Sequence, residues 1–307
     1  MSQTAPIRTL QLTPRDIEII LAVCDYDSLF SYQIRNRFWG QNSHPSTYYE
    51  RLGDLIKFDY LRARPMNSLS GRGSGTRLIT IGRASHSLLR ERRGFDELAI
   101  KRLRHSVPLS DWPHDAEVRD VRPMLESAAA NHPSVTALDW TNEAVYKRAP
   151  IKVELTSADK PGGLVTIKLI PDGGFCLELS SGQRKEHYLE VDRDTEHWSK
   201  IVDRIRAYCQ HVGNAQIPVL WIVPSRRRAE QLAASILKEA QTLQARASIF
   251  AITTLDQVDE RSILTSSIWQ VVGVAQKRSL LPSSPQTAES KDGEVWLLSL
   301  GQETTSA

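Results

Sequence analysis

Three acidic residues are spaced so that their carboxylates can come together. Glu190 and Asp192 lie two residues apart in the run "HYLEVDRDTEHW", so on a β-strand both point to the same face. Asp172 lies earlier, in the turn sequence "PDGG" that opens a predicted hairpin. Such a hairpin can bring Asp172 next to Glu190, and paired carboxylates hold Mg²⁺ or Mn²⁺ through their oxygens. Asp172 and Glu190 are therefore candidate metal ligands, and Asp192 is a candidate catalytic acid.

A metal held by these acids would activate a water molecule and stabilise charge on a phosphodiester. That chemistry also needs a nearby cation to orient the water or to neutralise the developing charge. Structural interpretations stay open beside it. Asp172 can instead serve its own turn backbone, and Glu190 and Asp192 can form a solvated strand end that pairs with Arg193 or Arg204. No zinc site and no organic cofactor is predicted.

Residues 115–280 must supply the elements that position these acids. Strand and helix patterns alternate there, which predicts an α/β domain with a hairpin in the middle. A closing helix is predicted around Ile268, and the C-terminal stretch 281–307 is expected to be a mostly flexible tail. Strands are predicted at 135–140, 164–170, 175–179, 187–191, 217–223 and 247–253, and helices at 116–132, 196–212 and 225–243.

The first 105 residues predict three short helices followed by a hairpin, which is a winged helix-turn-helix. Thr13 suits a helix cap, with Pro14 and Asp16 completing the signal, and Ser31 is the expected cap of the second helix. The third helix, starting near residue 43 or 46, would read a DNA groove, and the hairpin tip 71–75 is rich in glycine. The expected DNA contacts are His44, Ser46, Thr47, Tyr49 and Arg51 on the third helix and Arg72 and Arg77 on the hairpin.

An Arg-rich helix is predicted at about 85–104, and the two prolines in 106–114 mark a linker to the second domain. This helix can be a solvated face, a phosphate contact or a dimerising surface, so a homodimer is an open alternative. Charge separates along the chain: residues 1–107 carry 17 Lys and Arg against 10 Asp and Glu, and the remainder carries 22 against 26. A basic first third predicts double-stranded DNA as its partner.

Three cysteines without C-x-x-C spacing indicate a reducing compartment rather than a disulfide framework or a zinc site. The longest strongly apolar run, "IPVLWIV", is too short to cross a membrane. We therefore expect a soluble cytoplasmic protein with no membrane partner.

The motifs "PDG" and "LEVDRDTE", preceded by "PHD" and "DWTNEAV" and placed behind a helix that begins "LTPRDIEIIL", resemble the replication-relaxation family of plasmids and mobile elements. The resemblance covers residues 12–269. It implies that the second domain has a restriction-endonuclease-like, PD-(D/E)xK fold. It also implies catalytic acids at Asp172 and Glu190, with a lysine two residues after Glu190.

The sequence departs from that pattern because Asp192 occupies the position of the lysine. Lys200, on the following predicted helix, is one candidate replacement. Arg193 is another, although strand alternation should turn it to the opposite face. A lysine that has moved and a lysine that has been lost are both compatible with the sequence.

Two functions follow. The first is a DNA-binding protein of a plasmid or mobile element that acts in replication, mobilisation or their regulation, with a degenerate nuclease-like domain. The alternative is a metal-dependent DNA nickase or endonuclease that uses Asp172, Glu190, Asp192 and Lys200. The missing lysine favours the first, and the clustered acids, which repel one another, favour the second. We favour DNA binding.

Overall fold

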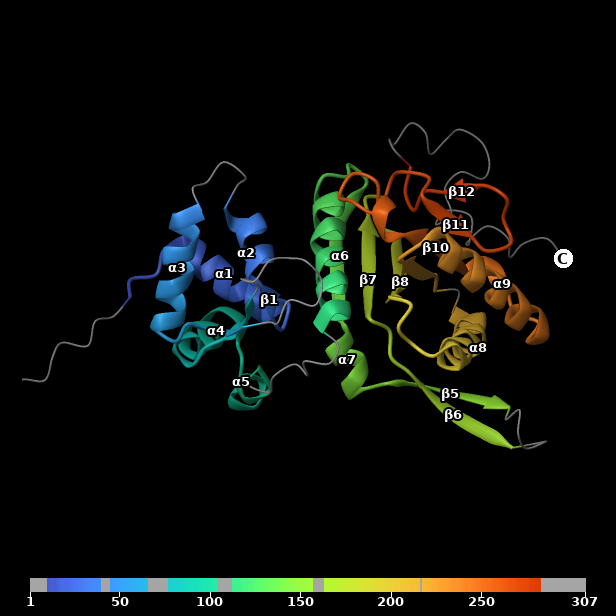
Figure 1. The fold of residues 1–307 in the computed structure, drawn as a ribbon, viewed down its shortest axis with the longest axis horizontal. Helices are drawn as coiled ribbons and strands as arrows, with labels where there is room; N and C mark the ends of the chain where they lie inside the picture. Colours follow the sequence, from blue (N-terminus) through green and yellow to red (C-terminus); the bar gives the residue numbers. More distant parts are fainter. Residues whose placement is uncertain are drawn as a thin grey trace, which may run out of the picture. The chain divides into compact units, whose positions relative to one another are not determined.

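The computed structural model describes residues 10–39, 45–65, 77–103, 112–156, 163–215 and 217–282. The chain is a mixed α/β protein with several sheets, and it divides into two compact units, Met1–Trp112 and Pro113–Ala307 (Figure 1). Gly40, the glycine-rich tip 71–75 and most of the predicted linker and tail lie outside the described residues.

The described part of the first unit begins with three helices and a small antiparallel sheet of order β1-β3-β2, and two further helices follow the sheet. The three predicted helices and the two hairpin strands are confirmed, whereas the two-residue strand β1 was not predicted. Apolar side chains of the helices and of the sheet pack together in one hydrophobic core. The elements are α1 (Pro14–Asp25), β1 (Leu29–Phe30), α2 (Ser31–Phe38), α3 (Pro45–Lys57), β2 (Leu61–Pro65) and β3 (Arg77–Ile81).

The start of α1 has the predicted capping box. The Thr13 hydroxyl accepts a hydrogen bond from the Asp16 amide, and the Asp16 carboxylate accepts one from the Thr13 amide. The prediction for α2 was wrong by one residue, because its cap is Phe30, whose amide donates to Gln33 Oε1 at 2.8 Å. Ser31 instead joins α2 to the sheet, since its hydroxyl accepts from the amide of Arg77 at 3.1 Å.

The single Arg-rich helix expected at 85–104 is also wrong. The chain forms a short 3₁₀ turn (Arg83–Ser85), then α4 (His86–Arg93), then α5 (Glu97–Leu103). Gly94 ends α4 with φ of 63°, a left-handed conformation that glycine adopts without the penalty other residues incur. Gly94 therefore divides the Arg-rich segment into two helices, although basic residues occur on both sides of it.

The second unit is built on a seven-stranded mixed sheet of order β12-β11-β10-β9-β8-β7-β4. Strands β8, β9 and β10 are parallel to one another, and the remaining neighbours are antiparallel. The strands are β4 (Val135–Asn142), β7 (Gly173–Leu179), β8 (Arg184–Val191), β9 (Val219–Val223), β10 (Phe250–Thr254), β11 (Trp269–Val271) and β12 (Lys277–Arg278).

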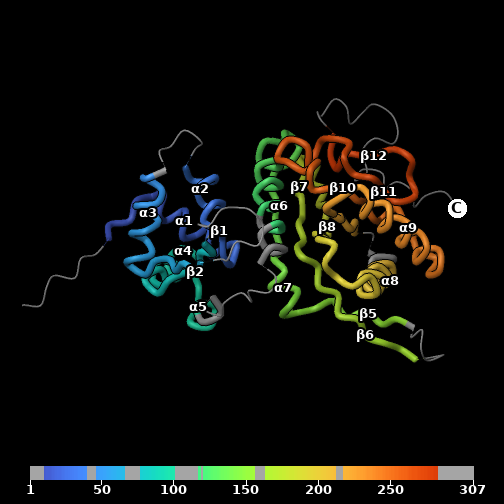
Figure 2. The backbone as a smooth tube through the Cα atoms, in the orientation of Figure 1, coloured from blue at the N-terminus to red at the C-terminus, as the bar shows by residue number. Residues whose placement is uncertain are grey.

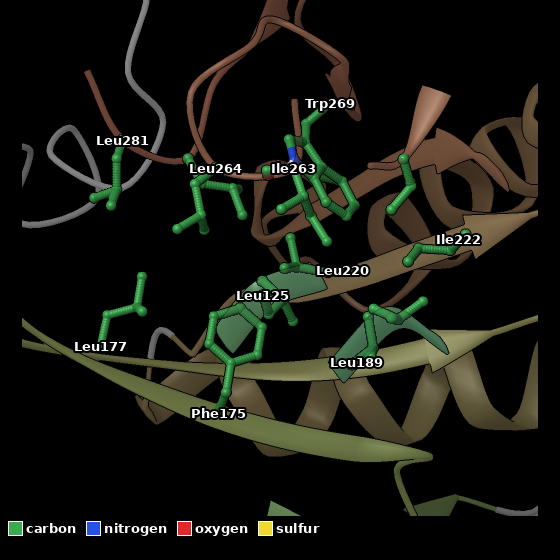
Figure 3. Packing of buried hydrophobic residues seen from close by; sticks show 14 of the residues in the cluster. Leu125, Phe175, Leu177, Leu189, Leu220, Ile222, Ile263, Leu264, Trp269 and Leu281 are labelled. Atoms are coloured by element: carbon green, nitrogen blue, oxygen red, sulfur yellow. Dashed lines mark hydrogen bonds between the residues drawn. The ribbon is translucent and has the colours of Figure 1, made fainter. Parts of the chain in front are cut away.

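Helices cover both faces of this sheet (Figure 1). On one face, α6 (Trp112–Ala130) and the segment that carries β11 enclose a core of aliphatic and aromatic side chains. On the other, α8 (Trp198–Ala215) and α9 (Arg226–Thr242) enclose a second core. Figure 3 shows the first core at close range, where side chains of the sheet meet Leu125 of α6 and Ile263, Leu264, Trp269 and Leu281.

A two-stranded antiparallel sheet, β5 (Ile151–Thr156) with β6 (Leu164–Leu169), extends from this unit as an arm and contacts α8 (Figures 1 and 2). Strand β5 and the short helix α7 (Glu143–Arg148) were not predicted. The closing helix around Ile268 was wrong, because β11 lies there. Trp269 and Val271 alternate with the partly buried Gln270, and this period of two suits a strand.

No helix among the described residues is long and apolar enough to span a membrane.

Candidate functional site

The β7–β8 hairpin brings Asp172 next to Glu190, as the sequence predicted. Gly173 of β7 pairs with Leu189 of β8, so Asp172 lies at the open end of the hairpin, opposite the end of β8. Its side chain is buried, and Oδ2 accepts a hydrogen bond from the amide of Val191 at 2.8 Å. Asp172 therefore joins the two strands instead of serving only its own turn.

The two glycines after Asp172 are required by close packing. A Cβ at Gly173 would lie 2.6 Å from the ring of Trp140, and a Cβ at Gly174 would lie 2.2 Å from the hydroxyl of Tyr146. Contacts this short are not seen for real Cβ atoms, so a larger residue at either position would force Trp140 or Tyr146 to move. The "PDGG" sequence thus fixes the backbone that carries Asp172.

Glu190 is fully buried, and both of its carboxylate oxygens have donors from α8. Oε2 accepts from Nη1 of Arg204 at 2.9 Å, and Oε1 accepts from the hydroxyl of Tyr208 at 2.6 Å. A buried carboxylate needs such partners, because an unpaired charge in the interior is costly. The structural interpretation that paired Glu190 with Arg204 is thus correct in its partner, although Glu190 is buried and Arg204, whose side chain is 27% exposed, reaches it from α8.

Arg204 lies among three carboxylates. It donates to Glu190 and, at 3.0 Å, to Glu196. The pKa of its guanidinium is raised, mainly by the charge of Glu190 and further by the charges of Asp172 and Glu196. Burial and Glu190 also raise the pKa of Tyr208 well above its usual value, so Tyr208 is a neutral donor. Arg204 therefore neutralises Glu190 and lowers the net negative charge of this group of acids.

Asp192 points to the same helix layer as Glu190 but has a different partner. Its side chain is 5% exposed, and Oδ2 accepts from Nε of Arg228, in the first turn of α9, at 2.5 Å. Arg228 also bonds Asp194 at 2.7 Å and stacks on Trp198, with its Cζ 4.5 Å from the ring centre. Asp192 therefore anchors α9 to the end of β8.

Lys200 lies on the exposed surface of α8 and shares a cavity of about 370 Å³ with Asp172. Among the described residues, Arg204 also lines this cavity, but Glu190 and Asp192 do not. Arg193 turns to the opposite face, as strand alternation predicted, and pairs with Glu117 of α6 at 3.1 Å. The structure thus brings Asp172 and Lys200 to one cavity and separates Asp192 from it. The remaining lining residues are Glu143, Lys147, Ile167, Lys168, Leu169, Ile170, Glu196 and Asp203.

This arrangement does not fit Mg²⁺ or Mn²⁺ as it stands. Both oxygens of Glu190 have donor partners, and Arg204 occupies the position beside Glu190 where a metal ion would have to bind. The described residues contain no group of three or more His, Cys, Asp or Glu side chains that could hold a metal ion. A metal at this position would first have to displace Arg204.

The sequence did not predict that Tyr208 and Arg228 would bind Glu190 and Asp192, and it gave Arg204 only as a surface partner. The spacing of the helix that follows β8 could have indicated these partners, because Lys200, Arg204 and Tyr208 follow one another at intervals of four residues. On a helix this spacing places all three on one face, so Lys200 could have indicated the two side chains that hold Glu190. No comparable signal indicated Arg228.

The predicted reading helix α3 exposes Ser46, Thr47 and Tyr49, and Tyr49 is 61% exposed. Arg77 is exposed at the start of β3, whereas His44 and Arg72 lie outside the described residues. Arg51 is bound within the unit: its Nε donates to Asp16 Oδ1 at 2.9 Å, and its Nη2 donates to the carbonyl of Gln11 at 2.9 Å. Asp16 is fully buried, so this pair stabilises the fold.

The model of the Replication-relaxation family matches residues 28–218, more than half of the chain. The chain belongs to the Replication-relaxation family. The match begins at β1 and ends just before β9, so it includes Asp172, Glu190, Asp192, Lys200 and the helix α8, but not Arg228. Membership suggests a role related to plasmid replication. No curated protein and no solved structure matches this Replication-relaxation chain.

Proposed function

We propose that this protein binds double-stranded DNA in plasmid replication or its regulation, and that its second unit does not cut DNA. In this proposal the first unit is a winged helix, and the second unit has a restriction-endonuclease-like fold that has lost its metal site. The observation that carries the proposal is the pairing of Glu190 with Arg204 and Tyr208 inside the protein.

The arrangement of the first unit supports DNA binding. Three helices are followed by an antiparallel strand pair, and α3 presents hydroxyl and phenol groups to solvent at Ser46, Thr47 and Tyr49. Side chains of this kind bond phosphates and base edges. Residues 1–107 also carry the excess of Lys and Arg that attracts a polyanion.

Arg51 is better assigned to the stability of the fold than to DNA contact. Its guanidinium bonds the buried carboxylate of Asp16, and only 25% of its side chain is exposed. A phosphate would have to compete with that partner. The DNA-contacting set that we propose from the described residues is therefore Ser46, Thr47, Tyr49 and Arg77.

Loss of cutting follows from the charges around Glu190. A metal-dependent nuclease needs carboxylates that are open to the ion. Here the guanidinium of Arg204 pairs with Glu190 where a metal ion would otherwise bind. Asp192, which stands where a lysine is expected, forms an ion pair with Arg228. The acids that made the sequence resemble a nuclease therefore hold α8 and α9 to the sheet.

A binding experiment on the full chain tests DNA contact. The variant Thr47→Ala/Tyr49→Ala/Arg77→Ala should bind double-stranded DNA more weakly, with a salt slope lower by about one for the lost arginine contact. Arg261→Ala, which removes one exposed cation of the second unit, is the surface control and should leave affinity and slope unchanged. Unchanged affinity and slope in the triple variant would refute the role of α3 and β3.

One observation favours a second candidate function. Lys200 and Asp172 line one cavity, so the lysine missing after Glu190 could be replaced from α8. In that case the protein would be a Mg²⁺- or Mn²⁺-dependent nickase that uses Asp172, Glu190, Asp192 and Lys200. Nicking of supercoiled plasmid that requires metal and disappears in Asp172→Ala and Glu190→Ala would establish this function instead.

A further inference from the structure

The outer face of the β5–β6 arm carries two lysines directly opposite each other. Lys152 of β5 pairs in register with Lys168 of β6, so both side chains point to the same side of the arm. Both are exposed. Within the described residues, neither has a hydrogen-bond or ion-pair partner. The opposite face is apolar and packs on α8 through side chains that include Val153 and Leu155.

This pairing is unfavourable for an isolated arm. Side chains directly opposite on an antiparallel pair have Cβ atoms about 4.5–5.5 Å apart, and like charges in these positions destabilise the pair. Several other basic side chains of the second unit lie within salt-bridge distance of acids, as in Lys147–Glu143, Arg184–Glu178, Arg193–Glu117 and Arg206–Glu239. The lysine pair therefore lacks the neutralisation that these other cations have, and an external anion would supply it.

We propose that the outer face of the β5–β6 arm binds the phosphate backbone of double-stranded DNA. This inference rests on the proposed function and adds a second DNA contact, in the second unit. Lys168 is also one of the residues that line the cavity at Asp172. Lysine is a flexible point charge that follows a phosphate backbone without reading sequence.

The other groups on this face agree with a backbone contact. Thr166 lies two positions from Lys168 and offers a hydroxyl that can donate to a phosphate oxygen. Glu154, opposite Thr166, is the one acid among the described residues of this face and limits how far the contact extends along the arm. The contact is thus expected to centre on Lys152 and Lys168.

The test is a salt titration of DNA binding by the full chain. Lys152→Gln/Lys168→Gln should lower the slope of log affinity against log salt by about two, because two phosphate contacts are lost. Binding at about 0.1 M salt should weaken on the order of tenfold, equally for unrelated DNA sequences. Lys238→Gln/Arg261→Gln removes two exposed cations outside the arm and should leave the slope unchanged.

The outcomes separate this inference from the proposed function. If the wild-type protein does not bind DNA, the proposed function fails. If it binds, but Lys152→Gln/Lys168→Gln keeps the wild-type slope, the arm inference alone fails. Thermal unfolding shows whether the variant is folded, and its midpoint should stay level or rise because the repulsion is gone. If the variant does not fold, the charge-conserving variant Lys152→Arg/Lys168→Arg is measured instead. It should retain the wild-type salt slope, and a slope lower by about two would overturn the inference.

Discussion

Replacing Arg204 should reveal how strongly Glu190 depends on its cation. In Arg204→Met the aliphatic stem is kept, but Glu190, which has no exposed surface, loses its charged partner and keeps Tyr208. Removing one partner of a buried ion pair typically costs about 3–5 kcal/mol. Protonation sets an upper limit, because neutralising a glutamate of ordinary pKa, about 4.3, at pH 7 costs about 3.7 kcal/mol.

The cost should therefore depend on pH. The same arithmetic gives about 1 kcal/mol at pH 5, since less free energy is needed to protonate the carboxylate there. At pH 7 we expect a loss of about 3–3.7 kcal/mol, which lowers the unfolding midpoint of a unit of this size by about 6–15 °C. Arg204→Met/Glu190→Gln should recover most of this loss, because no charge is left buried.

Thermal and urea unfolding followed by circular dichroism measure these changes. Arg226→Met is the matched control, because Arg226 is 91% exposed and its pair with Glu230 should contribute less than about 1 kcal/mol. Added Mn²⁺ should raise the midpoint of Arg204→Met and leave the wild type unchanged. A loss below about 1 kcal/mol at pH 7, or a double variant no more stable than the single one, would refute the reasoning.

Three further outcomes test other parts of the structure by unfolding measurements. Arg51→Ala should destabilise the first unit by about 1.5–3 kcal/mol, because the buried Asp16 loses its charged donor; a change below about 0.5 kcal/mol would contradict this role. Burial lowers the pKa of His187 to about 3 from its usual 6.5, so below pH 6.5 the unfolded chain binds a proton that the folded chain does not, and stability falls towards pH 3. His187→Leu should reduce that fall by up to about 1.4 kcal/mol per pH unit, and an unchanged pH profile would exclude His187 as its source. Asp192→Lys, which restores the lysine expected after Glu190, should destabilise the second unit by about 3–5 kcal/mol, because it places a second cation against Arg228, and normal stability would show that this pair is dispensable.

The sequence predicted the elements whose patterns are long and periodic. Helices α1, α8 and α9 and the buried strand β9 follow directly from apolar spacing and flanking caps or turns. Most of the elements it missed are short, although the six-residue strand β5 was missed as well. Strands β1 and β11 are two and three residues long, too short to show a period, and they exist because neighbouring strands supply their hydrogen bonds.

Local geometry predicted the meeting of Asp172 and Glu190, because a hairpin fixes which residues lie opposite. Long-range packing decided the rest. Asp192 is neutralised by Arg228, which lies one helix and one strand later, and α9 must pack beside α8 before the two can meet. Such a partner has no local signal, so the sequence could show that acids gather without showing which cations neutralise them.

We propose above that the protein binds DNA without cutting it. The most direct measurement incubates the full chain with supercoiled plasmid in Mg²⁺ or Mn²⁺ and follows binding and plasmid topology in the same reaction. The account predicts a stable protein–DNA complex in which the plasmid remains supercoiled. Metal-dependent nicking by the wild type that disappears in Asp172→Ala would contradict it.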